Sequence, residues 1–303
     1  LEAKKKYVSK VLEFADLRDL PPLKVVINCG NGAAGPAVKE LKAILREKYP
    51  MLELIDILYE PDGTFPNGVP NPMLSENHLV TERAVLENAA DFGVAFDGDF
   101  DRCFLFDHRG RFVPTEIIIG ILCAHFAQNS ENCTVVQDPR LIFNIQNISE
   151  KFGIRNVQSR PGHLFMKKVM REHQAIYGGE ISAHHYFKDF NYCDSGMIPW
   201  LLIAEFIGRS HNRLADYVDE RRKAFPSSGE INFEVEDTRL LLNEVVKVFV
   251  TEAEEVIEDD GFSLRFDTWR FNIRGSNTEP LLRLNVESKG DEELLYRKIS
   301  ELS

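Results

Sequence analysis

One stretch near the start of the chain sets the class of fold. Residues 23–28 form a short apolar run that ends in a glycine-rich turn at 29–32. A helical pattern follows over 36–49, and a second apolar run covers 52–59. Two apolar runs separated by a helix predict a parallel β-α-β unit, because parallel strands need a long crossover connection. The chain is therefore expected to be an α/β protein.

A second and weaker copy of this pattern begins near residue 111. Residues 134–140 repeat the strand and the turn, and a helical pattern covers 141–152. Residues 175–178 then resemble 90–93, in both cases just before an unusual loop. Such internal similarity predicts two related α/β/α domains in tandem.

The pattern changes after the Pro-Ser-Ser-Gly stretch at 226–229. A strand-like segment at 230–235, a long helical pattern over 237–254 and further short strands are typical of a small α+β domain. The expected fold is α/β, with two tandem related α/β/α domains followed by a small α+β C-terminal domain. The expected domains are 1–110, 111–225 and 226–303.

Composition excludes several classes of protein. The 303 residues are 44% hydrophobic and 28% charged, as in ordinary globular chains. The net charge of −12 disfavours nucleic acid and anionic membranes as partners. No apolar stretch approaches the roughly 18 residues of a membrane span. The five cysteines form no C-x-x-C pair, which indicates reduced thiols and a cytoplasmic protein.

The acidic stretch at 97–101 predicts a metal site. Asp97, Asp99 and Asp101 alternate along the chain, and their mutual repulsion is relieved when a cation lies among them. Carboxylate oxygens are hard ligands that suit Mg²⁺. Arg102 is placed to neutralise a phosphate bound beside the metal. Nearby phenylalanines favour burial over a solvated acidic turn.

These motifs have alternative interpretations. The glycine spacing at 30–35 fits a dinucleotide-binding fingerprint, although a tight strand-to-helix turn also needs glycines. The acidic stretch resembles the start of an aspartate-nucleophile phosphatase, in which Asp97 attacks phosphorus. It departs from an EF-hand, which has glycine where Arg102 stands. Ser210 is expected to be the N-cap of a helix beginning near residue 214 rather than a nucleophile.

A second unusual loop at 178–187 predicts a sugar site. On a strand, Glu180, Ser182 and His184 would share one face. Their acceptors and the switchable imidazole suit a polyol, whose hydroxyls both donate and accept hydrogen bonds. His185 is expected to be a packed core residue.

A third loop, between strand-like segments at 269–273 and 281–286, predicts a phosphate site. Gly275 permits close approach of the backbone, and an arginine with short polar residues provides donors for a phosphate. The residues in question are Arg274, Ser276, Asn277 and Thr278.

Taken together, the stretches 97–102, 179–187 and 274–287 resemble the metal, sugar and phosphate loops of the α-D-phosphohexomutases. The bacterial phosphomannomutase/phosphoglucomutase branch matches best, and order and spacing agree over the whole chain. The resemblance implies reversible transfer of phosphate between C1 and C6 of a hexose, mannose or glucose, through a bisphosphorylated sugar. It also implies that the glycine-rich turn binds no nicotinamide.

The resemblance assigns roles to matched residues. Asp97, Asp99 and Asp101 would hold Mg²⁺ together with a phosphoserine. Glu180, Ser182 and His184 would bind sugar hydroxyls, and the loop from Arg274 to Thr278 would hold the phosphate that does not react. Gly162-His163 matches a family pair whose histidine contacts the ligand, and Arg160 occupies a position before this pair that is usually lysine. The expected catalytic residues are Arg102 and His163, and Arg160 is expected to bind substrate.

One family motif is absent from these 303 residues. No Thr-Ala-Ser-His-Asn-Pro segment, which carries the family's phosphoserine, occurs among them. The chain is expected to be a fragment without the N-terminal phosphoserine domain, which binds hexose phosphate weakly and is inactive alone. A non-catalytic sugar-phosphate-binding protein and, less favoured, an aspartate-nucleophile phosphatase are the alternatives.

Overall fold

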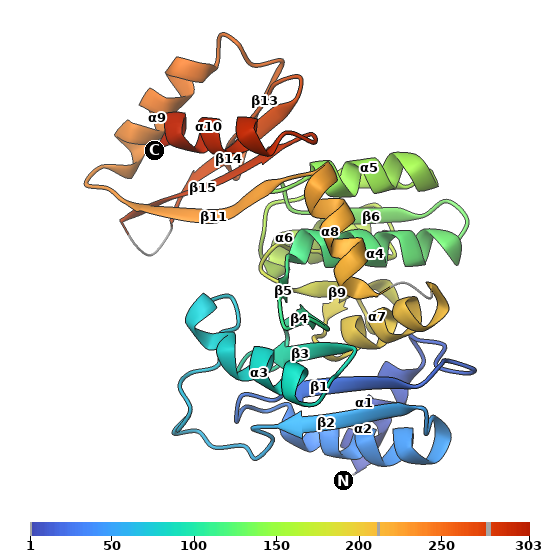
Figure 1. Cartoon of the computed structure of the whole chain (residues 1–303). Coiled ribbons are helices and arrows are strands. Elements are labelled where there is room, and N and C mark those ends of the chain that lie inside the picture. Colours follow the sequence, from blue (N-terminus) through green and yellow to red (C-terminus); the bar gives the residue numbers. More distant parts are fainter. Residues whose placement is uncertain (1, 211–212, 277–279) are drawn as a thin grey trace.

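Three five-stranded sheets follow one another along the chain (Figure 1). The computed structural model describes residues 2–210, 213–276 and 280–303. Each sheet is built from one continuous stretch of chain, in the order that the sequence predicts. Within the described ranges no helix is both long and apolar enough to cross a lipid bilayer.

The first sheet has helices on both faces. Its central strand β1 pairs in parallel with β2 and β3, while β4 and β5 are antiparallel. Apolar residues of α2 cover one face, and those of α3 cover the other. The strands are β1 (Leu23–Asn28), β2 (Leu52–Ile57), β3 (Phe92–Phe96), β4 (Cys103–Asp107) and β5 (Phe112–Val113). The helices are α1 (Glu2–Leu12), α2 (Gly35–Lys48), the 3₁₀ turn η1 (Ser75–Asn77) and α3 (Leu79–Glu87).

The second sheet repeats this topology. Its order β7-β6-β8-β9-β10 corresponds strand by strand to β2-β1-β3-β4-β5, with the same parallel and antiparallel pairs. The predicted tandem repeat is therefore confirmed. The strands are β6 (Thr134–Gln137), β7 (Arg155–Gln158), β8 (Tyr177–Gly179), β9 (His185–Phe187) and β10 (Cys193–Asp194). The helices are α4 (Thr115–Gln128), α5 (Phe143–Phe152), α6 (His163–Glu172), η2 (Lys188–Phe190), α7 (Met197–Ser210) and α8 (Leu214–Ala224).

The third sheet is antiparallel throughout, in the order β11-β15-β14-β13-β12. Apolar residues of both its helices join one cluster with those of the strands, which confirms the predicted α+β unit. The strands are β11 (Ser227–Glu234), β12 (Glu255–Asp259), β13 (Gly261–Arg265), β14 (Trp269–Gly275) and β15 (Leu281–Ser288). The helices are α9 (Thr238–Phe249) and α10 (Glu292–Leu302).

Two local expectations were wrong. The helix expected at 237–254 ends at Phe249, because residues 255–259 pair with β13 as a strand. Ser210 is the last residue of α7 rather than a cap, and the extended residue before α8 is Arg213.

The first two sheets share one hydrophobic core. Buried side chains of α4 and α7, such as Trp200, belong to the same cluster as Leu105 of β4. The third sheet has its own separate cluster. Strand β5 pairs with β4 although it lies beyond residue 110, which is the predicted end of the first domain. The domain limits therefore stay a prediction.

A buried polar interface attaches the third sheet to the second unit. The Glu287 carboxylate of β15 accepts hydrogen bonds from the backbone amides of Ile142 (2.6 Å) and Phe143 (3.0 Å), at the start of α5. Arg270 donates to Glu287 at 2.8 Å and to the Arg140 carbonyl at 3.0 Å. Both side chains are at most 3% exposed. An acid thus caps a helix of the neighbouring unit, where the helix dipole favours negative charge.

We expect Glu287→Gln to lower the free energy of unfolding by about 3 kcal/mol, because Arg270 would be left buried without a counter-ion. Urea unfolding followed by circular dichroism measures this change. The control is Glu293→Gln, since Glu293 lies exposed on α10. Equal losses in the two variants would show that the interface does not depend on the Glu287 charge.

Candidate active site

The three aspartates of the acidic loop converge between β3 and β4. Asp97 directly follows β3, and the chain enters β4 at Cys103. One carboxylate oxygen each from Asp97, Asp99 and Asp101 lies within 4.8 Å of the others. Asp97 is buried, whereas Asp99 is exposed. The predicted convergence is present, and the all-oxygen set of donors fits a hard divalent cation such as Mg²⁺.

Two glycines allow neighbouring backbone to pack against this loop. A Cβ atom added to Gly32 would lie 2.6 Å from the Gly98 carbonyl oxygen. One added to Gly196 would lie 2.6 Å from the Arg102 carbonyl oxygen and 2.7 Å from that of Phe100. These distances are too short for any side chain, so the loop is held in place by two backbone segments that approach it closely.

Close packing also explains the glycines at 30–35, whose spacing fits a dinucleotide-binding fingerprint. A Cβ atom on Gly30 would collide with Pro70 at 2.5 Å, and one on Gly35 would overlap the Tyr59 carbonyl. The glycines of the fingerprint are therefore explained by packing against the chain itself. The structure adds no support for a nucleotide site at this turn.

Arg102 is anchored to the acidic loop. Its Nε donates to Asp97 Oδ2 at 2.6 Å, and its backbone amide donates to Oδ1 at 3.2 Å. The guanidinium carbon lies 5.8 Å from the centre of the Phe104 ring. Burial raises the pKa of Asp97, and the hydrogen bond and charge of Arg102 offset only part of that effect.

The sugar loop is a turn, so the expectation of a strand over residues 180–184 was wrong. The amide of Ala183, which has φ of +70°, donates to the Glu180 carbonyl at 2.9 Å, and β9 starts only at His185. The three predicted side chains nevertheless converge, because the turn folds them together. Ser182 Oγ lies 3.2 Å from Glu180 Oε2 and 3.0 Å from His184 Nδ1.

Glu180 is the buried centre of this loop, at 1% exposure. It accepts hydrogen bonds from the Gly162 amide and from the Tyr186 hydroxyl, the latter at 3.3 Å. His184 Nδ1 lies 3.0 Å from its Oε2. Burial raises the pKa of Glu180, but the hydrogen bonds from His184 and Gly162 outweigh it and lower the pKa overall.

The acidic loop and the sugar loop touch each other. His184 Nε2 lies 3.6 Å from Asp101 Oδ2, and the backbones of Arg102 and His184 form an antiparallel bridge. Burial lowers the pKa of His184, but the hydrogen bonds to Asp101 and Glu180 raise it to about 9. The imidazole therefore carries a positive charge between two carboxylates. His185, by contrast, is fully buried beside Tyr177, as predicted.

His163 reaches the sugar loop from the first residue of α6. Its ring centre lies 4.8 Å from that of His184, and its Nδ1 lies 3.4 Å from Asp194 Oδ1. Lys167 Nζ approaches the same oxygen at 3.3 Å. Asp194 and Lys167 were missed at the sequence level. The sequence feature that could have indicated Asp194 is its place next to the Ser195-Gly196 pair, just before an apolar helix.

The predicted phosphate site is rich in arginine but already paired with acids. Arg274 lies 3.0 Å from Glu230 and 3.6 Å from Asp260. Arg283 stands opposite Arg274 in the strand register and lies 3.5 Å from Glu230. A bound phosphate would have to compete with these carboxylates.

The other predicted phosphate ligands are less well defined by the structure. Arg160 Nε lies 2.5 Å from Asp259 Oδ1, so this residue faces the third sheet. The Ser276 amide donates to the Leu281 carbonyl at 2.8 Å. Asn277 and Thr278 lie outside the described residues.

A chain of ion pairs connects this region to the sugar loop. Glu230 lies 3.7 Å from Arg140, which forms a buried 2.6 Å pair with Asp138. Asp138 Oδ2 in turn accepts a hydrogen bond from the Ile181 amide at 2.7 Å. The sequence did not single out these linking residues. They couple the position of the third sheet to the loop that carries Glu180.

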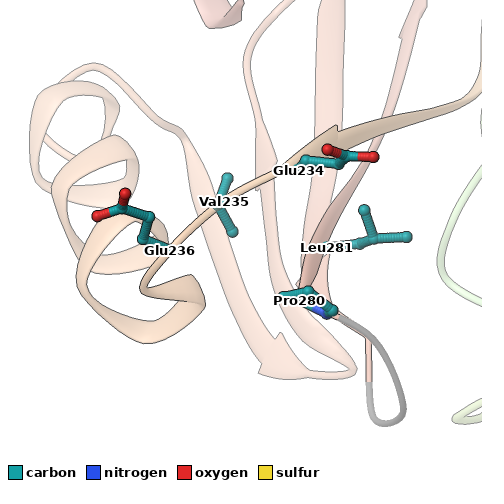
Figure 2. Close-up of a pocket in the computed structure, with 5 residues that line it drawn as sticks. All are labelled: Glu234, Val235, Glu236, Pro280 and Leu281. Carbon is teal, nitrogen blue, oxygen red and sulfur yellow. The ribbon is translucent and has the colours of Figure 1, made fainter.

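A pocket at the edge of the third sheet does not match a phosphate site. Figure 2 shows its five lining residues, which come from the end of β11 and the start of β15 and from the segments next to them. They are Glu234, Val235, Glu236, Pro280 and Leu281. Carboxylates repel an anion, and apolar side chains offer it no hydrogen-bond donor. This pocket therefore has the wrong chemistry for sugar phosphate.

Comparison with known proteins identifies three consecutive family segments. Residues 5–110 match phosphoglucomutase/phosphomannomutase alpha/beta/alpha domain II, and residues 115–225 match domain III. Residues 230–298 match the C-terminal domain of the same family.

Curated relatives agree with these matches. A phosphomannomutase of Salmonella montevideo is 47% identical over 296 residues, which cover 98% of this chain and 65% of the relative. Phosphohexose mutases of Xanthomonas campestris are 48% identical over 297 residues, with the same two coverages. The chain thus spans about two thirds of the length of these relatives.

Solved structures agree with the fold. A phosphoglucomutase/phosphomannomutase family protein of Burkholderia thailandensis superposes with a TM-score of 0.82 at 26% identity, covering 97% of this chain and 62% of that protein. A putative phosphomannomutase of Thermus thermophilus gives 0.76 at 19% identity, covering 99% of this chain and 66% of that protein. The chain belongs to the phosphoglucomutase/phosphomannomutase family, the α-D-phosphohexomutases.

Proposed function

We propose that these residues form the metal-, sugar- and phosphate-binding parts of a phosphomannomutase/phosphoglucomutase. This isomerase interconverts hexose 1-phosphate and hexose 6-phosphate, of mannose or glucose, with Mg²⁺, a phosphoserine and a bisphosphorylated sugar intermediate. It acts in cytoplasmic carbohydrate metabolism and supplies nucleotide-sugar biosynthesis. The observation that carries the proposal is the 3.6 Å contact between Asp101 and His184, which joins the acidic loop to the sugar loop. Relatives named phosphomannomutase support it at 47% identity.

Mg²⁺ would be held by Asp97, Asp99 and Asp101. Their donors are all oxygens and lie within 4.8 Å of one another, which suits Mg²⁺. When bound, the metal supplies positive charge beside the transferring phosphoryl group. Arg102 and His163 are the proposed catalytic residues, and Arg102 keeps the shape of the acidic loop through both oxygens of Asp97.

Hexose hydroxyls would contact Glu180, Ser182 and His184. Glu180 remains ionised and His184 charged, so the loop presents both a strong acceptor and a strong donor. The phosphate that does not react would lie among Arg160, Arg274 and Ser276, with Asn277 and Thr278 assigned from the sequence alone. Its binding would displace the acids that now pair with Arg160 and Arg274.

The phosphatase alternative is less well supported. Arg102 donates hydrogen bonds to both carboxylate oxygens of Asp97, which lowers the nucleophilicity of this carboxylate but leaves lone pairs free for a metal. The non-catalytic alternative differs from the mutase in turnover and not in binding, so a binding experiment and a turnover experiment together distinguish them.

Asp99→Asn should weaken Mg²⁺ binding at least tenfold, because one anionic ligand is lost at an exposed position where folding is little affected. Titration calorimetry on the 303-residue chain measures the dissociation constant. Asp267→Asn, at an exposed aspartate of the third sheet, is the matched control. Unchanged Mg²⁺ affinity in Asp99→Asn would remove this residue from the metal site.

Gly196→Ala should also weaken Mg²⁺ binding several-fold, although all three aspartates remain. The added methyl group would push against the Arg102 and Phe100 carbonyls and displace the acidic loop. Gly63→Ala is the control, because a Cβ there meets no atom within 4 Å. The same calorimetric titration applies, and equal affinities in both variants would mean that the loop tolerates the shift.

The 303-residue chain should bind mannose 6-phosphate in the presence of Mg²⁺ and show no multiple turnover. It contains no Thr-Ala-Ser-His-Asn-Pro segment to carry the phosphate between the two half-reactions. Calorimetry tests binding, and a coupled assay from mannose 1-phosphate tests turnover. Failure to bind hexose phosphate argues against the proposed function, whereas turnover that Asp99→Ala abolishes argues only against the need for that segment.

In a protein that carries the phosphoserine segment, Asp99→Ala and Arg102→Ala should each lower kcat about a hundredfold or more. Both residues act where charge develops on the phosphoryl group. Steady-state kinetics with mannose 1-phosphate measures the effect. Retention of most of kcat in either variant would contradict the assigned role.

A further inference from the structure

Four side chains beside the acidic loop form a second cluster with the composition of a metal site. They are Asp101, His163, His184 and Asp194, and one ligand atom from each lies within 4.8 Å of the others. Four different segments supply them, namely the acidic loop, the start of α6, the turn after β8, and β10. The cluster is therefore a product of the tertiary fold and not of one acidic stretch.

The spacing suits a tetrahedral ion. With metal–ligand bonds of about 2.0–2.2 Å, the ligand atoms of a tetrahedral zinc site lie about 3.3–3.6 Å apart. His163 Nδ1 and Asp194 Oδ1 are 3.4 Å apart, and His184 Nε2 and Asp101 Oδ2 are 3.6 Å apart. Two imidazoles and two carboxylates favour a transition-metal dication over Mg²⁺, which prefers oxygen ligands alone.

A buried oxygen points to a missing partner. The Asp194 side chain is only 9% exposed, and its Oδ2 has no hydrogen-bond partner in the part of the chain that the structure describes. Lys167 approaches the other oxygen, Oδ1, at 3.3 Å. A buried carboxylate oxygen without a partner is costly, so a cation bound by the Asp194 carboxylate would relieve an existing penalty.

Glu180 orients one of the imidazoles toward the cluster. It lies 3.0 Å from Nδ1 of His184, which leaves Nε2 facing Asp101. A carboxylate behind a histidine is the usual outer support of a zinc ligand, because it sets the ring orientation and increases the basicity of the coordinating nitrogen.

We propose that His163, His184 and Asp194, with Asp101 shared with the acidic loop, form a second metal site that takes a transition-metal dication such as Zn²⁺. Zn²⁺ would take the place of the proton on His184 Nε2, which is released to solvent, and would occupy the imidazoles of both His163 and His184. Zn²⁺ should therefore inhibit binding of hexose phosphate, and this consequence, unlike the metal site itself, rests on the proposed function.

The test is a Zn²⁺ titration of the 303-residue chain with Mg²⁺ present at saturation, followed by calorimetry. The visible spectrum of a Co²⁺-loaded sample reports tetrahedral coordination by nitrogen. His163→Ala and Asp194→Asn should each weaken Zn²⁺ binding at least tenfold and abolish that spectrum. His173→Ala, at the far end of α6, is the matched histidine control, and Asp267→Asn, at an exposed aspartate of the third sheet, is the matched aspartate control. Both controls should keep the wild-type affinity for Zn²⁺.

Two results would overturn the site. One is equal Zn²⁺ affinity in the wild type and in His163→Ala, whose mutated side chain is 46% exposed and so should not affect folding. The other is loss of Zn²⁺ binding in Asp99→Asn, which would place the ion in the acidic loop. A titration with mannose 6-phosphate in the presence and absence of Zn²⁺ tests the consequence separately. If Zn²⁺ binds but hexose phosphate never does, the proposed function fails and the metal site stands.

Discussion

Carboxylates that a fold brings together away from water need positive charge among them, and the candidate active site is organised around that need. Arg102 holds Asp97, and the imidazolium of His184 lies between Asp101 and Glu180. The His184 cation also connects the sugar loop to the acidic loop. The contact of His184 with Asp101 thus holds the sugar loop beside the acidic loop, and the three aspartate oxygens suit a divalent ion.

The two α/β units present these loops from equivalent places. The acidic loop connects β3 to β4, and the sugar loop connects β8 to β9, which hold the same positions in the two sheets. A shared hydrophobic core fixes the first two units against each other, so the loops meet on a rigid base. The third sheet has a separate core and is attached through buried ion pairs such as Arg270 with Glu287. Its position relative to the sugar loop therefore depends on polar contacts that require good geometry.

Much of this arrangement was predictable from the chain alone. The apolar run at 23–28, the helical pattern after it and the repeat near 134–140 specify an α/β topology, because hydrophobic periodicity reports secondary structure directly. The three aspartates converge as expected, because the turn around Gly98 brings their carboxylates close together. The strand expected at 180–184 was wrong, because Ala183 adopts a left-handed conformation that no periodicity reveals.

The sequence by itself determined the order of the elements, the identity of the three motifs and the family to which they belong, because these depend on local pattern. Only the tertiary structure decided which distant groups meet. It brought Asp194 to His163, placed Glu287 at the start of α5, and showed that Gly196 packs on the acidic loop. Such contacts join residues far apart in the chain, and they arise from the packing of whole elements rather than from the preferences of any one segment.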